Sequence, residues 1–250
     1  PKAEGYQSQI MEAMEYSVMA GGKRLRPMLM QETYRLFGGE GKEIEPFMAA
    51  MEMIHTYSLI HDDLPGMDDD ALRRGKPTNH IVYGVGMATL AGDGLQTQAF
   101  ENITGYWLAQ NKPEIGLRAA HELAIGAGNQ GMVVGQAQDL LAEGKHIDEA
   151  NMKYIHAHKT GALITASVRI GAIIGGANEE QLAALSRYGQ HIGLAFQITD
   201  DILDVVGDEA SLASLSAAMR RTKKPPTQRS TASTLPAPWP RSSAALLRNV

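Results

Sequence analysis

Two clusters of aspartates, far apart in the chain, hold the side chains best suited to chemistry. Their members are Asp62, Asp63, Asp68, Asp69 and Asp70 in IHDDLPGMDDD, and Asp200, Asp201 and Asp204 in FQITDDILD. Carboxylates packed this densely repel one another unless water or cations neutralise them. One cluster alone would most simply be a solvated acidic loop. Two clusters of oxygen donors suit a hard cation such as Mg²⁺, which binds carboxylates together with substrate phosphates, and they predict a diphosphate held between two metal-bearing walls.

Basic residues near the first cluster indicate where phosphates could bind. Arg73 and Arg74 follow the cluster directly, and Lys23, Arg24 and Arg26 lie in the turn GGKRLRP, just before an expected helix. Clustered lysine and arginine side chains near a helix N-terminus suit an anion. The same turn could be an ordinary charged connection between helices, and on local grounds both interpretations stay open.

Three other polar positions are candidates with simpler alternatives. His55 precedes Asp62 by seven residues, about two helical turns, so both lie on a similar face of one helix. It is either a packed or surface histidine or a hydrogen-bond donor to a phosphate. Lys159 and Thr160 are either a surface pair or part of the same site.

The second cluster is expected on a helix. Gln197, Asp200 and Asp204 are spaced three and four residues apart, and therefore share one helical face. Like charges at this spacing destabilise an isolated helix. We therefore expect a cation that compensates them.

Helical periodicity dominates the elements that must position these residues. Apolar side chains recur at helical spacing in residues 6–19, 28–37, 44–61, 81–110, 115–143, 148–176 and 180–206. No segment shows the alternation of a half-buried strand. We predict an all-α fold, a single-domain bundle of long helices around a central active-site cavity.

Composition narrows the class of protein. With 250 residues and 44% apolar content, the chain can bury a large core. It contains no cysteine, which excludes disulfides and zinc–thiolate sites and fits a reducing, cytoplasmic setting. The net charge of −5 argues against nucleic-acid binding. No apolar run is long enough for an integral membrane segment, and we expect no signal peptide.

Five motifs, taken together and in order, resemble the short-chain trans-prenyl diphosphate synthases, most closely the bacterial farnesyl or geranylgeranyl diphosphate synthases. They are GGKRLRP, IHDDLPGMDDDALRRGKPTNH, GQAQDL, KTGALI and GLAFQITDDILD. The resemblance covers about residues 6–212, and two aspartate motifs at this separation are highly specific. The family begins about one helix earlier, so we expect an N-terminally shortened copy.

The resemblance implies a reaction, a fold and a set of roles. The family joins isopentenyl diphosphate to an allylic diphosphate on an all-helical isoprenoid-synthase scaffold, with Mg²⁺, as a homodimer. The resemblance implies that three Mg²⁺ ions are bound by Asp62, Asp68 and Asp200, and that the catalytic clusters are completed by Asp63, Asp201 and Asp204. It implies that the allylic diphosphate is bound by Arg73, Lys159, Thr160 and Gln197. It also implies a metal-free isopentenyl diphosphate site formed by Lys23, Arg26, His55 and Arg74.

Product length is expected to follow from two residues before the first cluster. Tyr57 and Ser58 lie five and four residues before Asp62. At 1.5 Å rise per residue, Tyr57 is about 7.5 Å further from the metals. A ring at that depth could block the growing tail, which predicts a fifteen-carbon farnesyl product, with geranylgeranyl as the alternative. Tyr57 could also be an ordinary core residue.

The resemblance ends at Leu212. Residues 213–250 form a basic segment rich in proline and serine, with no acidic residue, where the family expects further helices. Codons for Leu212 to Arg229 can be chosen so that restoring one deleted G just after Leu212 encodes LGKPVGSDETNKKATYPA, which matches the expected family segment. We therefore predict a helical domain over residues 1–212 and an out-of-frame tail over residues 213–250.

Two other classes of function remain open. A class I terpene cyclase shares the ionisation chemistry, but it has no second diphosphate for Lys23, Arg26, His55 and Arg74 to hold. An inactive dimerising subunit or remnant would retain the aspartates only if the defect in the tail were recent. Chain elongation, a cyclic product or no product distinguishes the three.

Overall fold

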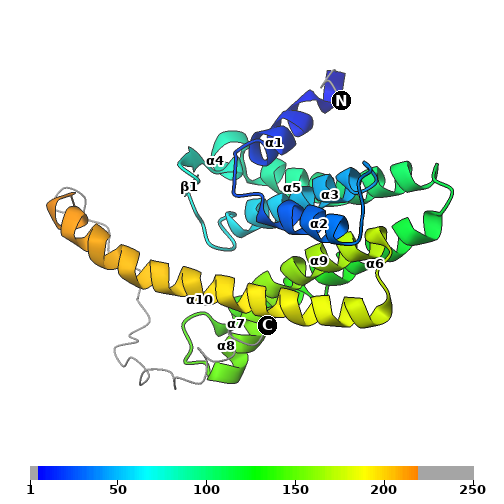
Figure 1. Ribbon diagram of the computed structural model, residues 1–250. Helices are drawn as coiled ribbons and strands as arrows, with labels where there is room; N and C mark the ends of the chain where they lie inside the picture. Colours follow the sequence, from blue (N-terminus) through cyan, green and yellow to red (C-terminus); the bar gives the residue numbers. More distant parts are fainter. Residues whose placement is uncertain (1–4, 219–250) are drawn as a thin grey trace. The chain divides into compact units, whose positions relative to one another are not determined.

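The computed structural model describes the backbone of residues 5–218 and the side chains of residues 5–199. This part of the chain is almost entirely helical (Figure 1). The elements are a 3₁₀ turn Gly5–Gln7, α1 (Ser8–Val18), α2 (Leu25–Leu36), α3 (Glu45–Asp62), β1 (Leu72–Arg73), β2 (Lys76–Pro77), α4 (Asn79–Tyr83), α5 (Val85–Trp107), α6 (Pro113–Ala127), α7 (Met132–Ala142), α8 (Glu149–His156), the π-helical turn η2 (Ala157–Gly161), α9 (Ala162–Gly175) and α10 (Glu179–Ala218).

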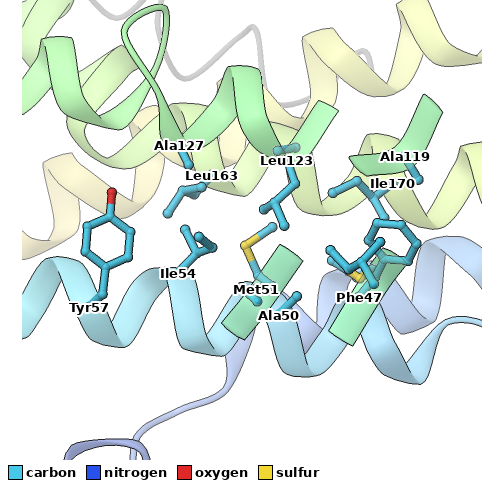
Figure 2. Packing of buried hydrophobic residues seen from close by; sticks show 14 of the residues in the cluster. Phe47, Ala50, Met51, Ile54, Tyr57, Ala119, Leu123, Ala127, Leu163 and Ile170 are labelled. Carbon is cyan, nitrogen blue, oxygen red and sulfur yellow. The ribbon is translucent and has the colours of Figure 1, made fainter. Parts of the chain in front are cut away.

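The hydrophobic core is built around α3. Figure 2 shows one face of this helix, with Phe47, Ala50, Met51, Ile54 and Tyr57 in a row, opposite Ala119, Leu123 and Ala127 of α6 and Leu163 and Ile170 of α9. All of these side chains are buried. Complete burial of each large apolar side chain contributes about 1.5–3 kcal/mol. This row fixes α3, and with it the position of the first aspartate cluster.

Glycines allow α9 to pack closely against its neighbours. A Cβ on Gly171 would overlap the backbone of α2 at Met30, and one on Gly126 of α6 would lie 2.8 Å from Ala166 Cβ. Arg169 of α9 forms two hydrogen bonds to Glu122 of α6. Because the helix axes approach so closely, α2, α6 and α9 form a compact scaffold beside α3.

Three predicted helices are interrupted. Gly84, at φ 85°, separates α4 from α5, since this left-handed backbone ends a helix. Residues 128–131 separate α6 from α7, and η2 interrupts the helix predicted over 148–176. Helical periodicity continued across each break, which explains why sequence patterns alone did not place them.

A small hairpin contradicts the expectation that no strand would form. β1 and β2 pair antiparallel, with Arg73 opposite Lys76. Arg74, at φ 54°, and Gly75, at φ 75°, make the tight turn between them. Two-residue strands are too short to show alternation in the sequence, and this hairpin sets the direction of the two arginines that follow the first cluster.

Helix α10 extends beyond the predicted end at residue 206 and reaches Ala218. By its internal contacts the chain divides into two units, residues 1–202 and 203–250, so α10 contributes to both. Residues 213–218 of the predicted out-of-frame tail are helical, and residues 219–250 lie outside the described residues. Among the described helices, none combines the length and apolarity required to cross a membrane.

Candidate active site

A cavity of about 270 Å³ lies beside the C-terminal half of α3. Its walls come from α2, α3, α7 and η2. Seven of the predicted site residues line it, namely Arg26, His55, Tyr57, Ser58, Asp62, Lys159 and Thr160. The structure therefore brings together polar residues that are separated by up to 134 positions in the sequence.

Asp62 ends α3 at the edge of this cavity. The pKa of its carboxyl is raised to about 6, mainly by burial. Asp68 and Asp63 contribute to this rise, and Lys159 and Arg73 oppose it. The Asp68 amide donates a hydrogen bond to the Asp62 carbonyl oxygen at 2.9 Å, which folds the DDLPGMD segment back on itself. The Asp62 carboxyl therefore lies in a poorly hydrated position, with the cations Lys159 and Arg73 close enough to act on it.

Asp63 points away from the cavity and is only 4% exposed. Its Oδ1 accepts a hydrogen bond from Arg73 Nε at 2.7 Å and forms an ion pair with Arg73 Nη2 at 2.6 Å. Burial raises the pKa of Asp63, and Arg73 opposes this. Because Arg73 also lies 3.5 Å from Asp70, two carboxylates of the first cluster hold this guanidinium beside the site.

Arg26 and His55 form a basic, poorly hydrated corner of the cavity. Burial lowers the pKa of the Arg26 guanidinium to about 10, and its Nε has no hydrogen-bond partner among the described residues. Burial, together with the positive charges of Arg26 and Arg74, lowers the pKa of His55 to about 3. His55 is therefore neutral near pH 7. This corner can bind an anion through the charged Arg26 guanidinium and one N–H of the neutral His55 ring.

The other two predicted cations of this region lie next to the glycine turn of GGKRLRP. Arg74 Nη1 donates to the Gly21 carbonyl oxygen, and a Cβ on Gly22 would lie 2.8 Å from that nitrogen. Lys23 is exposed, with Nζ 5.9 Å from the ring centroid of Phe196 in α10. Neither side chain lines the cavity.

The π-helical turn η2 presents Lys159 and Thr160 to the cavity. π turns inside helices are often found at functional sites, because the extra residue redirects the side chains that follow. Lys159 Nζ forms an ion pair with Asp139 of α7 at 2.6 Å. A Cβ on Gly135 would overlap the Lys159 backbone, so this glycine allows α7 to lie directly against the turn.

Helix α10 approaches the cavity through Gln197. Thr160 Oγ1 donates a hydrogen bond to Gln197 Oε1 at 3.0 Å. A Cβ on Gly193 would lie 2.7 Å from the Gly161 Cα, so α10 and η2 are in close contact. Asp200 is three residues, about one helical turn, beyond Gln197 on this helix. The side chains of Asp200, Asp201 and Asp204 lie outside the described residues.

Sequence reasoning did not assign two polar pairs of this region. Asp139, the partner of Lys159, lies in the motif GQAQDL, which did not indicate this pairing. The ion pair between Arg24 and Glu52 of α3 had no signal in the sequence, because the two residues are 28 positions apart. Arg24 also donates to the Val18 carbonyl oxygen at 2.8 Å, and it ties the GGKRLRP turn to α1 and α3.

The donor set fits a hard divalent cation. Among the described side chains, no group of three or more histidine, cysteine or acidic residues forms a complete metal site. Two of the three predicted ligands, Asp62 and Asp68, lie in this part of the chain, and both offer carboxylate oxygens. The Asp68 carboxylate lies near enough to act on the pKa of Asp62, so the two carboxylates are close together, as joint binding of a hard cation requires.

Comparison with known proteins identifies the family. The polyprenyl synthetase family matches residues 7–214. The chain belongs to this family. A farnesyl diphosphate synthase of Geobacillus stearothermophilus is 52% identical over 205 residues, which are 82% of this chain and 69% of that protein. The Escherichia coli farnesyl diphosphate synthase is 48% identical over 216 residues, 86% of this chain and 72% of its own length.

Other polyprenyl synthetases extend the comparison. A chloroplastic geranylgeranyl pyrophosphate synthase of Catharanthus roseus is 49% identical over 205 residues, 82% of this chain and 57% of that protein. The crystal structure of an FPP/GFPP synthase of Zymomonas mobilis superposes with a TM-score of 0.78 at 42% identity, covering 82% of this chain and 74% of the other. These relatives confirm the predicted all-α fold and the prenyltransferase class, and they favour a synthase over a terpene cyclase.

Proposed function

We propose that this chain condenses isopentenyl diphosphate with an allylic diphosphate and that its main product is farnesyl diphosphate. One observation carries the proposal: a single cavity has Asp62 and the cations Lys159 and Arg26 at its polar side and the buried Tyr57 ring within its wall. That arrangement suits a substrate with a charged head and an apolar tail.

The proposed first step is ionisation of the allylic C–O bond. Asp62, Asp68 and Asp200 would hold Mg²⁺, which supplies positive charge to the diphosphate as it leaves. Lys159 and Arg73 add fixed cations nearby, and Thr160 can donate a hydrogen bond to the substrate in place of the one it gives to Gln197. These groups stabilise charge that grows in the transition state, so they lower the barrier more than they strengthen ground-state binding.

The second diphosphate is proposed to bind at the Arg26–His55 corner. Arg26 offers a buried guanidinium with a free Nε–H, and neutral His55 can donate one hydrogen bond. Lys23 and Arg74 extend the basic surface toward the glycine turn. A metal-free site of this kind would orient the isopentenyl double bond toward the allylic cation, which apolar walls shield from water.

Tyr57 is proposed to limit the product to fifteen carbons. Its ring is 5% exposed, and its hydroxyl extends away from α3 at the end of the core row (Figure 2). Replacing Tyr57 with alanine should shift the product from farnesyl to geranylgeranyl diphosphate. An unchanged product distribution would show that another residue ends chain growth.

The decisive experiment is incubation with labelled isopentenyl diphosphate, geranyl diphosphate and Mg²⁺. Formation of a fifteen-carbon diphosphate supports the proposal, whereas a cyclic hydrocarbon made without isopentenyl diphosphate supports a terpene cyclase. No product would support an inactive subunit. Repeating the assay on a chain whose residues 213–250 are replaced by the in-frame sequence tests whether the tail limits activity, and an intact mass tests whether the printed tail exists.

We also propose a homodimer formed through α4 and α5. These helices expose four large apolar side chains, and α5 has a glycine near each end with open space around it. The residues are Ile81, Val82, Val85, Leu90, Gly86 and Gly105. Exposed apolar side chains grouped in this way are typical of a protein–protein interface. Light scattering should report a dimer, and Leu90→Arg should yield a monomer. If the wild-type protein is a monomer, α4 and α5 do not form a dimer interface.

A further inference from the structure

The ring of His61 occupies a slot that one glycine creates. His61 is on the last turn of α3, and a Cβ on Gly92 of α5 would overlap its imidazole. Gly92 is buried inside a helix and has no positive φ to explain it. Since glycine in a helix interior is unfavourable, its use here is explained by the space that the imidazole needs.

A hydrogen bond holds the imidazole in this slot. His61 Nε2 lies 3.0 Å from the Thr89 carbonyl oxygen, which can only accept, so Nε2 carries the proton and donates. The Asp93 carboxylate lies 3.8 Å from the same nitrogen. The ring is thus tied to α5 both by shape and by a directional bond.

The same imidazole supports Tyr57, one helical turn earlier on α3. The two rings meet edge to face, with centroids 5.7 Å apart and an interplanar angle of 76°. The Tyr57 hydroxyl is buried and has no hydrogen-bond partner among the described residues. No polar contact of its own therefore fixes the Tyr57 ring, and its position depends on the side chains packed against it.

We propose that His61, seated against Gly92, is a positioning residue that determines product length by holding the Tyr57 ring in place. The inference rests on the proposed function, in which Tyr57 stops chain growth. It adds that Tyr57 stops chain growth only while His61, held against α5, supports its ring. The imidazole lines the cavity next to Tyr57. Without it, the tyrosine ring gains space beside it and yields to a longer tail.

Product analysis of His61 variants tests this inference. His61→Ala should raise the ratio of geranylgeranyl to farnesyl diphosphate at least fivefold. His61→Gln keeps a donor for the Thr89 carbonyl but loses the aromatic edge, so it should shift the product in the same direction. His61→Phe keeps a ring against Tyr57 and should retain farnesyl diphosphate. A merely structural role would lower yield in all three without changing the product ratio.

A stability cycle tests the slot independently of activity. Gly92→Ala should destabilise the chain when His61 is present, and should be tolerated at least tenfold better, in the unfolding equilibrium constant, in the His61→Ala background. Gly94→Ala is the matched control on the same helix, because its methyl would meet only the flexible Met14 side chain, with Sδ at 3.0 Å. If the effects of Gly92→Ala and His61→Ala on unfolding free energy are additive, Gly92 does not make room for the His61 ring and the inference is wrong.

Tyr57→Ala, measured in parallel, separates the two proposals. If Tyr57→Ala lengthens the product and His61→Ala does not, the inference is wrong and the tyrosine stop stands. If neither changes the product, both are wrong. If the wild-type chain forms no product, the proposed function fails and product control by His61 fails with it, while the stability cycle still reports on the slot.

Discussion

The two halves of α3 both bury apolar side chains, but only the C-terminal half also borders a cavity. Phe47, Met51 and Ile54 interdigitate with α6 and α9 (Figure 2). Beyond Ile54, Tyr57 and Asp62 face a cavity. The neighbours differ: α7 packs tightly on η2, and residues of both line the cavity beside this half of α3. One helix therefore supplies both the stability of the fold and the wall of the site.

The largest expected effect is on catalysis in the open half. Asp62→Asn removes a proposed metal ligand and should lower kcat about 10³-fold, as losses of electrostatic stabilisation of this kind typically do. In the absence of metal, the Asp62→Asn variant should be at least as stable as the wild type, because the substitution removes a buried negative charge. Steady-state kinetics and thermal unfolding measure the two effects. A large loss of stability would show that Asp62 has a structural role instead.

The packed half should respond in the opposite way. Leu123→Ala removes a fully buried side chain opposite Met51 and should cost about 2–5 kcal/mol of unfolding free energy. The folded fraction should still make the wild-type product, since Leu123 does not line the cavity. Urea unfolding and product chromatography test this. An altered product would show that the cavity reaches into the packed half.

His55, between the two halves, should make stability sensitive to acid. Its folded pKa of about 3 lies below the ordinary value of 6.5, so the unfolded chain takes up a proton that the folded chain does not. The stabilisation is complete above about pH 6.5 and is lost as pH falls toward 3. At pH 5 this effect is on the order of 1–2 kcal/mol. His55→Gln should therefore show a shallower loss of Tm between pH 7 and 5, and an unchanged slope would contradict the buried, neutral assignment.

The smallest expected effect concerns the hydroxyl at the boundary. Tyr57→Phe removes a buried hydroxyl without a partner in the described structure and keeps the ring. Stability should stay within about 1 kcal/mol of the wild type, or rise, because no hydrogen bond is lost. The product should remain the same. A shift in product would mean that the hydroxyl, rather than the ring, limits the tail.

Much of the fold could be predicted from helical periodicity, because amphipathic helices repeat a burial pattern every few residues. The interruptions at Gly84, residues 128–131 and η2 could not, because periodicity persisted across them. The hairpin at Leu72–Arg73 was missed, since two-residue strands are too short to alternate. In the site, the motifs singled out Asp62, Lys159, Thr160 and Gln197. That Lys159 pairs with Asp139 and Thr160 with Gln197 depended on which helices meet.

The sequence by itself determined the chemistry: two aspartate clusters, the basic residues around the first, and the helices that bear them. These follow from residue type and local spacing, which the chain carries wherever it folds. Only the tertiary structure decided that Asp62, Arg26 and Lys159 share one cavity, that Asp63 turns away to bind Arg73, and that His61 sits against Gly92 beside Tyr57. Such contacts join positions far apart in the chain, and they depend on how closely helices approach, which no local pattern encodes.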